Sequence, residues 1–177
     1  FLKAARRFGT TAAFAAPALG NLLSGQGAVI RLSGTTVEEM TVKTPAAICG
    51  SLGEPPKMRY GAKNQAPQTR MGAAALLRQT FIEAREYQDK LADYERKAAE
   101  FEKKVKEGKA GDEAAPAPPA RNAKMEAVSL LLKGEPPLVL HAQRMDDILT
   151  ALRIADEFGL RLVIAGGAEA HKVKEKL

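Results

Sequence analysis

The stretch LVLHAQRMDDILTALRIADEFGLRLVIAGG, residues 138–167, decides the fold class of this chain. Two short apolar runs, Leu138 to Leu140 and Leu160 to Ile164, carry few polar residues, which is typical of parallel strands buried on both faces. A helical pattern separates the runs, so the stretch predicts a β-α-β crossover, a unit that is right-handed in nearly all proteins. Because parallel strands end at one edge of a sheet, we expect His141 and Gly166-Gly167 to lie at the carboxyl edge, where α/β proteins place their sites.

The helix between the two runs has clear start and stop signals. Asp146 and Asp147 fall in its first turn, where carboxylates interact favourably with the positive end of the helix dipole. Gly159 stands where a C-terminal cap is expected. Apolar residues recur at helical spacing and predict an inner face that packs on the sheet, formed by Ile148, Leu152, Ala155 and Phe158.

Residues 72–107 predict one long amphipathic helix. Apolar residues recur every seven positions, with aromatic residues between them at offsets of three and four. This narrow apolar seam, with mixed charges around it, is typical of a helix that packs against a single neighbour, so we interpret the aromatic residues as packing residues. The seam is formed by Leu77, Ala84, Tyr87, Leu91, Tyr94, Ala98, Phe101 and Val105.

Changes of composition divide the rest of the chain. Residues 1–71 predict short strands and glycine-rich loops, with extended segments at Ala28 to Leu32 and Ala46 to Cys49. Residues 108–122 are rich in alanine and proline and predict a solvated linker. Residues 123–177 predict a short helix followed by the β-α-β unit.

The first twenty residues, FLKAARRFGTTAAFAAPALG, have a basic start and an alanine-rich middle, as a signal peptide would. We favour a helix from Leu2 to Phe8 that turns at Gly9 into a strand from Thr10 to Phe14, because the apolar part is weak and no initiator methionine is present. A chain that opens within a helix leads us to expect further residues upstream.

The composition argues against several classes of function. Of the 177 residues, 45% are apolar, and the longest apolar run is far shorter than the roughly 18 residues that span a membrane, so we expect no membrane span. The net charge is +6, but basic and acidic residues are interleaved and no basic-aromatic motif occurs, so we expect no nucleic-acid partner. The single cysteine, Cys49, rules out an internal disulfide framework.

Few side chains suit catalysis. His141 is either a metal ligand or a histidine hydrogen-bonded within the rim of the fold. His171 is expected to face solvent or a neighbouring helix, and Cys49 ends an apolar strand, where a lone cysteine is typically a core residue. Two glycine-rich segments, residues 20–30 and 165–173, are candidate anion sites, although neither has the Gly-Lys-Ser/Thr ending of a P-loop.

Four separated blocks, in the same order over nearly the whole chain, resemble the amidohydrolase superfamily in its imidazolonepropionase-like branch. The blocks are RRFGTTAAFAAPALGNLLSGQGAVI (6–30), TVEEMTVKTPAAICGSLGEPPK (36–57), YGAKNQAPQTRMGAAALLR (60–78) and LVLHAQRMDDILTALRIADEFGLRLVIAGGAEAHKV (138–173). The resemblance implies an α/β fold: part of a (β/α)8 TIM-type barrel, about its third to sixth strands, with a long helical insertion. Such a barrel takes about 250 residues, so the resemblance implies a segment of a longer polypeptide or one of several chains.

The resemblance also implies a chemistry. Members of the family use one or two divalent metals, commonly zinc, to activate a water that attacks an amide-type carbon. On this pattern His141 is the fifth-strand metal ligand. Two ligand positions depart from the pattern, because Cys49 stands about where a bridging lysine belongs and Ala165-Gly166 stands where many relatives carry a histidine. These losses exclude the usual two-metal bridge and leave a mononuclear site with ligands from outside the segment.

Two functional hypotheses follow from the resemblance. The first is a metal-dependent hydrolase, with zinc as the divalent ion, that acts on a C–N bond in a small amide, a cyclic amide or a dipeptide. The second is a catalytically inactive amidohydrolase-fold subunit with a structural or assembly role, in which the long helix is a docking element. On both hypotheses we expect a homo-oligomer or a larger assembly. Relatives in this branch include exported proteins, so a periplasmic and a cytoplasmic location are both compatible with the sequence.

Overall fold

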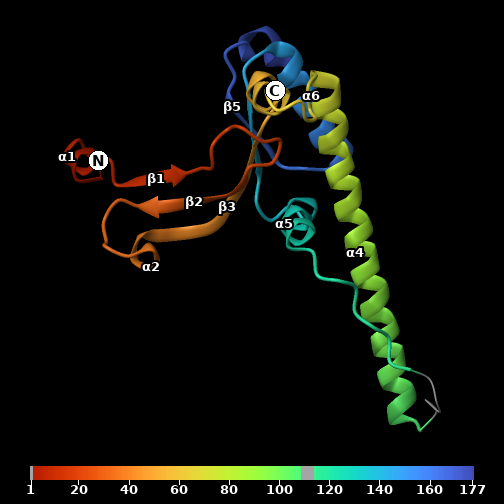
Figure 1. Cartoon of the computed structure of the whole chain (residues 1–177). Helices are drawn as coiled ribbons and strands as arrows, with labels where there is room; N and C mark the ends of the chain where they lie inside the picture. Colours follow the sequence, from red (N-terminus) through yellow and green to blue (C-terminus); the bar gives the residue numbers. More distant parts are fainter. Residues whose placement is uncertain (1, 109–113) are drawn as a thin grey trace.

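A five-stranded sheet in the order β1–β2–β3–β4–β5 organises the chain (Figure 1). The structure is a computed structural model and describes residues 2–108 and 114–177. The sheet is curled into a half-barrel, which is consistent with part of a barrel. The strands are β1 (Ala12–Ala15), β2 (Gly25–Arg31), β3 (Thr41–Ser51), β4 (Leu138–Ala142) and β5 (Leu162–Gly166).

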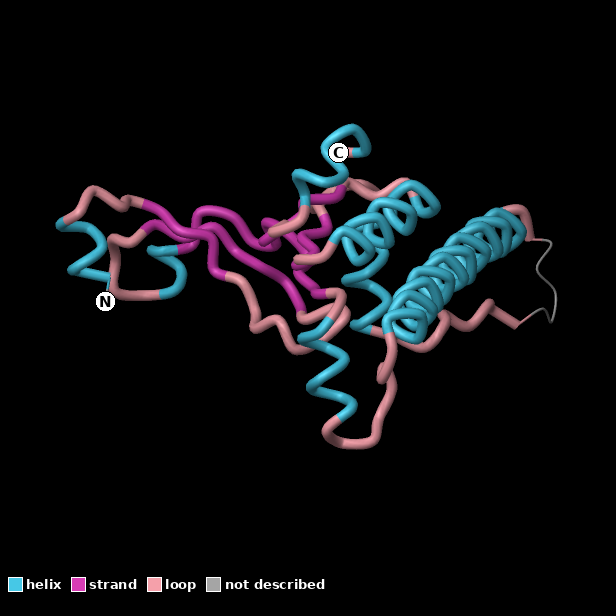
Figure 2. Tube along the Cα trace, turned by 90° about the horizontal axis from the view of Figure 1, so that it is seen from above, coloured by secondary structure: helices cyan, strands magenta, loops and turns pink. Residues whose placement is uncertain are grey.

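Most of the helices gather at one end of the sheet, whereas the first two lie at its far end (Figure 1). Figure 2 shows the larger helices packed around the end formed by β3, β4 and β5, while β1 and β2 extend away from them as an arm. The helices are α1 (Leu2–Arg7), α2 (Val37–Met40), α3 (Glu54–Gly61), α4 (Arg70–Lys106), α5 (Ala123–Leu132), α6 (Met145–Phe158) and the 3-10 helix η1 (Ala170–Lys176).

The β4–α6–β5 unit has the arrangement that its sequence pattern predicts. β4 and β5 pair in parallel, with Leu138 opposite Leu162 and Leu140 opposite Ile164. α6 ends at Gly159, whose left-handed backbone (φ +67°) lets its N–H bond back to carbonyl groups of the last turn. The inner face differs slightly from the prediction, because Leu152 is only partly buried.

The strands before β3 differ from the expected arrangement. The third to sixth strands of a barrel would all run parallel, but parallel pairing is found between β3, β4 and β5, whereas β1–β2 and β2–β3 are antiparallel. The connections explain the difference, because parallel neighbours need a crossover of a dozen or more residues, usually a helix. Residues 16–24 hold no helix or strand and residues 32–40 hold only the four-residue α2, so β1 and β2 fold back as an antiparallel ribbon.

α4 covers the residues for which the seven-residue pattern predicts a helix. Its start is capped by Thr69, whose hydroxyl accepts a hydrogen bond from the N–H of Gly72 (3.0 Å). Its first half is buried against α5 and α6, and its second half projects from the body of the molecule (Figure 1). In the described part of the chain, neither α4 nor any other helix combines the length and apolar character that crossing a membrane requires.

The segment after α4 is irregular where it is described. Of the predicted linker at residues 108–122, residues 109–113 lie outside the described residues, and residues 114–122 hold no helix or strand. Pro116 and Pro119 line the same hollow as Tyr94 of α4. The segment therefore returns along α4 and covers part of its aromatic seam.

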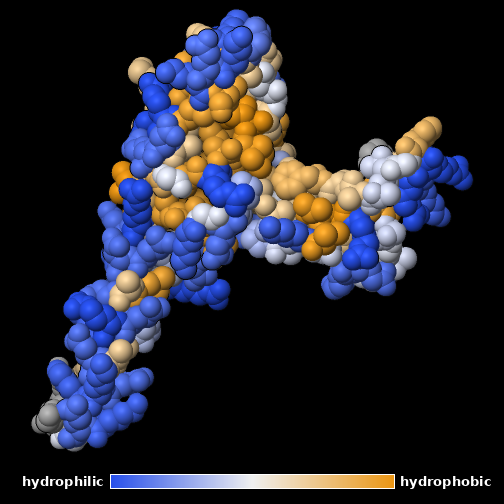
Figure 3. All heavy atoms as spheres, turned by 180° about the vertical axis from the view of Figure 1, so that it is seen from behind, coloured by the Kyte–Doolittle hydropathy of each residue, from blue (hydrophilic) through white to orange (hydrophobic). Residues whose placement is uncertain are grey.

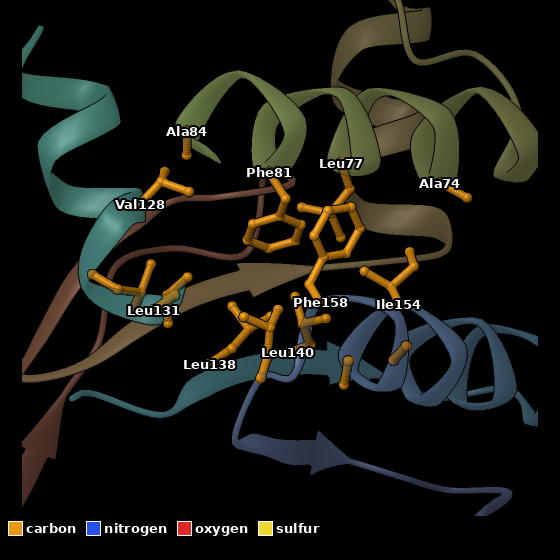
Figure 4. Packing of buried hydrophobic residues seen from close by; sticks show 14 of the residues in the cluster. Ala74, Leu77, Phe81, Ala84, Val128, Leu131, Leu138, Leu140, Ile154 and Phe158 are labelled. Atoms are coloured by element: carbon orange, nitrogen blue, oxygen red, sulfur yellow. The ribbon is translucent and has the colours of Figure 1, made fainter. Parts of the chain in front are cut away.

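The hydrophobic core lies between α4, α5, α6 and one face of the parallel strands (Figure 4). The rings of Phe81 and Phe158 meet there with their centroids 5.1 Å apart. Leu138 and Leu140 of β4 are fully buried in this core. Because side chains alternate along a strand, Val139 and His141 point to the opposite face of the sheet.

Candidate functional site

His141 lies at the carboxyl edge of the three parallel strands. In the sheet register it stands between Ser51 of β3 and Ala165 of β5. These three residues share the face that is turned away from the core, since side chains alternate along each strand. Gly166 and Gly167 follow directly, so the predicted meeting of His141 with the glycine pair at one edge is what the structure has.

Ser51 beside His141 is a structural residue. It is fully buried, and its hydroxyl donates to the carbonyl oxygens of Leu19 and Asn21. Its backbone N–H also donates to the carbonyl oxygen of Asn21 (3.1 Å). These bonds anchor the loop before β2 along the free edge of β3, so the Ser51 hydroxyl is engaged in packing and is not presented as a nucleophile.

Gln143 contacts His141 directly and was not assigned a role by the sequence. Its Nε2 lies 2.9 Å from Nε2 of His141, and its Oε1 accepts a hydrogen bond from the N–H of Ala168 (3.1 Å). The contact joins the turn after β4 to the turn after β5. The only signal in the sequence was the position of Gln143 two residues after a histidine at a strand end.

Gly166 makes room for this contact. A Cβ at position 166 would lie 2.7 Å from Nε2 and 3.0 Å from Cδ of Gln143, and the backbone has φ +87°, which L side chains rarely adopt. The resemblance places a lost metal ligand at Ala165-Gly166. In the structure the amide of Gln143 occupies the space over this glycine.

The described residues do not hold a metal ion on their own. Nδ1 of His141 is buried and has no hydrogen-bond partner within residues 2–108 and 114–177, and Nε2 contacts Gln143. No group of three or more His, Cys, Asp or Glu side chains converges in that part of the chain. Protein zinc sites take at least three protein ligands. His141 is therefore one ligand-type group without a complete set around it.

Cys49 does not reach the carboxyl edge, and the expectation that it ends a strand there is wrong. β3 continues for two residues beyond it, so Cys49 pairs with Val139 while Ser51 pairs with His141. The thiol is buried, with 3% of the residue exposed, and it packs against Gly27 of β2. Burial raises the pKa of the Cys49 thiol, which disfavours the thiolate that a metal would need. Cys49 is a buried packing residue on the face of the sheet that also carries Val139 and His141.

The two glycine-rich segments give backbone N–H groups to hydrogen bonds within the fold. In the second segment the N–H groups of residues 167–170 all donate to protein acceptors, two of them to the carbonyl groups of Ala142 and Gln143. In the first, the N–H of Ser24 donates to the carbonyl of Cys49. His171 is exposed on η1, as the sequence predicts.

A buried ion pair beside the edge was missed by the sequence analysis. Asp147, with 7% of its side chain exposed, accepts a hydrogen bond from Nε of Arg70 (3.0 Å), and Nη2 of Arg70 reaches Glu54 (2.9 Å). Burial raises the pKa of Asp147, while the guanidinium of Arg70 opposes that shift. A pocket of about 420 Å³ lies here between the first turns of α4 and α6, and His141 is not among its lining residues. The sequence signal was the paired carboxylates at Asp146 and Asp147, interpreted only as dipole partners.

Comparison with solved structures finds a longer protein with the same architecture. The crystal structure of an amidohydrolase from Thermotoga maritima MSB8 matches 93% of this chain, with 38% sequence identity and a TM-score of 0.76. The chain spans 39% of the length of that amidohydrolase. No family model matches the chain, and no curated protein matches it. The chain is therefore similar over most of its length to part of an amidohydrolase, which supports the amidohydrolase family at a coarse level.

Proposed function

We propose that this chain is part of a metal-dependent amidohydrolase of the imidazolonepropionase-like branch. The enzyme hydrolyses a C–N bond in a small amide, a cyclic amide or a dipeptide. The observation that carries the proposal is the position of His141, a half-buried imidazole at the carboxyl edge of the parallel strands. Barrel enzymes place their active sites at this edge.

His141 contributes one ligand to a single divalent ion, and zinc is the ion we expect. The other ligands come from outside the described residues. This part of the proposal is supported by the incomplete ligand set of the described residues and by the comparison, since the chain spans 39% of the length of the amidohydrolase that it resembles.

The surroundings of His141 suit a small substrate with an apolar part. Val139 of β4 and Val163 and Ala165 of β5 share its face of the sheet, and Val163 is 47% exposed. Figure 3 shows a broad apolar surface on the body of the molecule, seen from behind the view of Figure 1. Apolar walls with a few placed polar groups are typical of small-molecule sites.

A second candidate function is favoured by Gln143. Its amide occupies Nε2 of His141, and the described residues bring no further ligand to the ring. This arrangement fits an amidohydrolase-fold subunit without catalytic activity that serves a structural or assembly role. The projecting half of α4 would then be the docking element of that subunit.

Metal analysis of the purified protein separates the two candidates. After dialysis against metal-free buffer, the hydrolase proposal predicts a stoichiometric zinc ion that is lost in His141→Ala and retained in His171→Ala. His171 is exposed, so its variant is a matched control for histidine replacement. A protein without bound metal, or one that keeps its metal in His141→Ala, would contradict the proposed site.

Activity is measured on the same three proteins with dipeptides, N-acyl amino acids and cyclic amides. The hydrolase proposal predicts turnover of at least one substrate class, lost in His141→Ala and kept in His171→Ala. Bound zinc without turnover on any of the three classes would favour the inactive subunit.

A further inference from the structure

The amide of Gln143 has a defined orientation at the carboxyl edge. A backbone N–H is only a donor, so the side-chain atom of Gln143 that faces the N–H of Ala168 at 3.1 Å is the carbonyl oxygen Oε1. The other end of the amide is then the NH2 group. That group faces Nε2 of His141 at 2.9 Å.

This orientation decides where the proton of the His141 ring lies. An NH2 group has no lone pair to offer, so Nε2 of His141 has to accept the hydrogen bond and carries no proton. A neutral ring then carries its proton on Nδ1, a buried nitrogen without a hydrogen-bond partner among the described residues. The opposite tautomer would place two donors against each other at 2.9 Å.

We propose that Gln143 is a positioning residue that holds His141 as the Nδ1–H tautomer, with its Nε2 lone pair directed at the amide of Gln143. The inference rests on the proposed function, in which His141 is a ligand of a divalent ion. A neutral imidazole binds a metal through an unprotonated nitrogen, so this tautomer keeps Nε2 ready for an ion that displaces the amide.

Gly166 leaves the space in which the Gln143 amide contacts His141. The Gln143 amide lies directly over this glycine, and any side chain at position 166 would push it away from His141. Gln143 itself is exposed, so its replacement removes the contact without opening the core.

The test is the tautomer ratio of His141, measured by NMR on the purified protein with 15N-labelled histidine rings. Spectra are recorded near pH 9, where imidazole rings are neutral. Exposed His171 serves as the internal reference, and His171→Asn assigns the signals. The wild-type protein should show His141 mainly as Nδ1–H.

Three variants give graded expectations. Gln143→Leu, which lacks the amide, should lower the ratio of Nδ1–H to Nε2–H by about fivefold, the effect of one neutral hydrogen bond. Gln143→Glu presents an acceptor in place of the NH2 group and should reverse the preference. Gly166→Ala keeps Gln143 but displaces it, and should act in the same direction as Gln143→Leu.

A wild-type ring that is mainly Nε2–H, or a ratio that is the same in wild type, Gln143→Leu and Gln143→Glu, would overturn the inference. Zinc is added to the wild-type protein as a separate arm. If zinc leaves the His141 signals unchanged while the variants shift the ratio, the proposed metal site fails and the positioning role of Gln143 stands. The two failures are therefore distinguishable.

Discussion

Alanine at position 166 should destabilise the protein more than alanine at position 167. Both glycines have a positive φ, +87° at Gly166 and +69° at Gly167, so each replacement carries a backbone cost of about 1 kcal/mol. Their surroundings differ. A Cβ at 166 would lie 2.7 Å from Nε2 of Gln143, whereas the nearest atom to a Cβ at 167 is Cβ of Ala170 at 3.4 Å, an ordinary contact.

The extra cost at Gly166 follows from the bonds that Gln143 would lose. The end of its flexible side chain can swing away, but it then gives up the hydrogen bonds to His141 and to the N–H of Ala168. Each such bond contributes about 0.5–1.5 kcal/mol, and both are exposed to solvent, so the sum is about 1–2 kcal/mol. We expect a loss of about 2–3 kcal/mol for Gly166→Ala and about 1 kcal/mol for Gly167→Ala.

Urea denaturation followed by circular dichroism measures these free energies of unfolding. A double-mutant cycle with Gln143→Ala isolates the contact, because the backbone cost at Gly166 is the same in both backgrounds. The coupling should be about 1–2 kcal/mol. Equal costs for the two glycine variants, or additivity of Gly166→Ala and Gln143→Ala within about 0.5 kcal/mol, would refute the reasoning.

Three further predictions concern the core, the ion pair and the thiol. Phe81→Ala should lower the free energy of unfolding by about 3–5 kcal/mol, because Phe81 is fully buried. Ile82→Ala, at a residue that is 41% exposed, should lower it by less than about 1 kcal/mol. Similar losses for the two variants in urea denaturation would contradict this placement of α4. Asp147→Asn should lower the free energy of unfolding by about 2 kcal/mol. This loss is smaller than that for breaking a fully buried ion pair, because Arg70 keeps 28% of its side chain exposed. An unchanged melting temperature would show that the ion pair contributes nothing to stability. Because burial raises the pKa of Cys49, its thiol should react with iodoacetamide far more slowly in the native protein than in urea. In the unfolded chain the Cys49 thiol ionises at its ordinary pKa, whereas in the folded protein it stays protonated to higher pH. The free energy of unfolding should therefore fall as the pH rises through the ordinary thiol pKa, and it should fall less in Cys49→Ala.

Local pattern alone was enough for α1, α4, α5, α6 and the parallel unit, but it did not predict α2 and α3. α6 follows from apolar residues at helical spacing, carboxylates in its first turn and Gly159 at its end, and each of these signals acts within a few residues. The long α4 follows from a seven-residue repeat in the same way. The placement of His141 with the glycine pair required one further step, that parallel strands end at a common edge.

The tertiary structure decided the direction of β1 and β2, the depth of Cys49 and the contacts of the polar side chains. Each depends on residues distant in the chain. Gln143 is held by Ala168, 25 residues away, and Arg70 pairs with Asp147, 77 residues away. A hydrogen bond or an ion pair forms wherever the folded backbone brings a donor to an acceptor, and no local periodicity encodes that meeting. The sequence by itself therefore determined the longer helices α4 and α6, the parallel β-α-β unit and the edge at which His141 lies, and only the folded chain decided which groups surround His141.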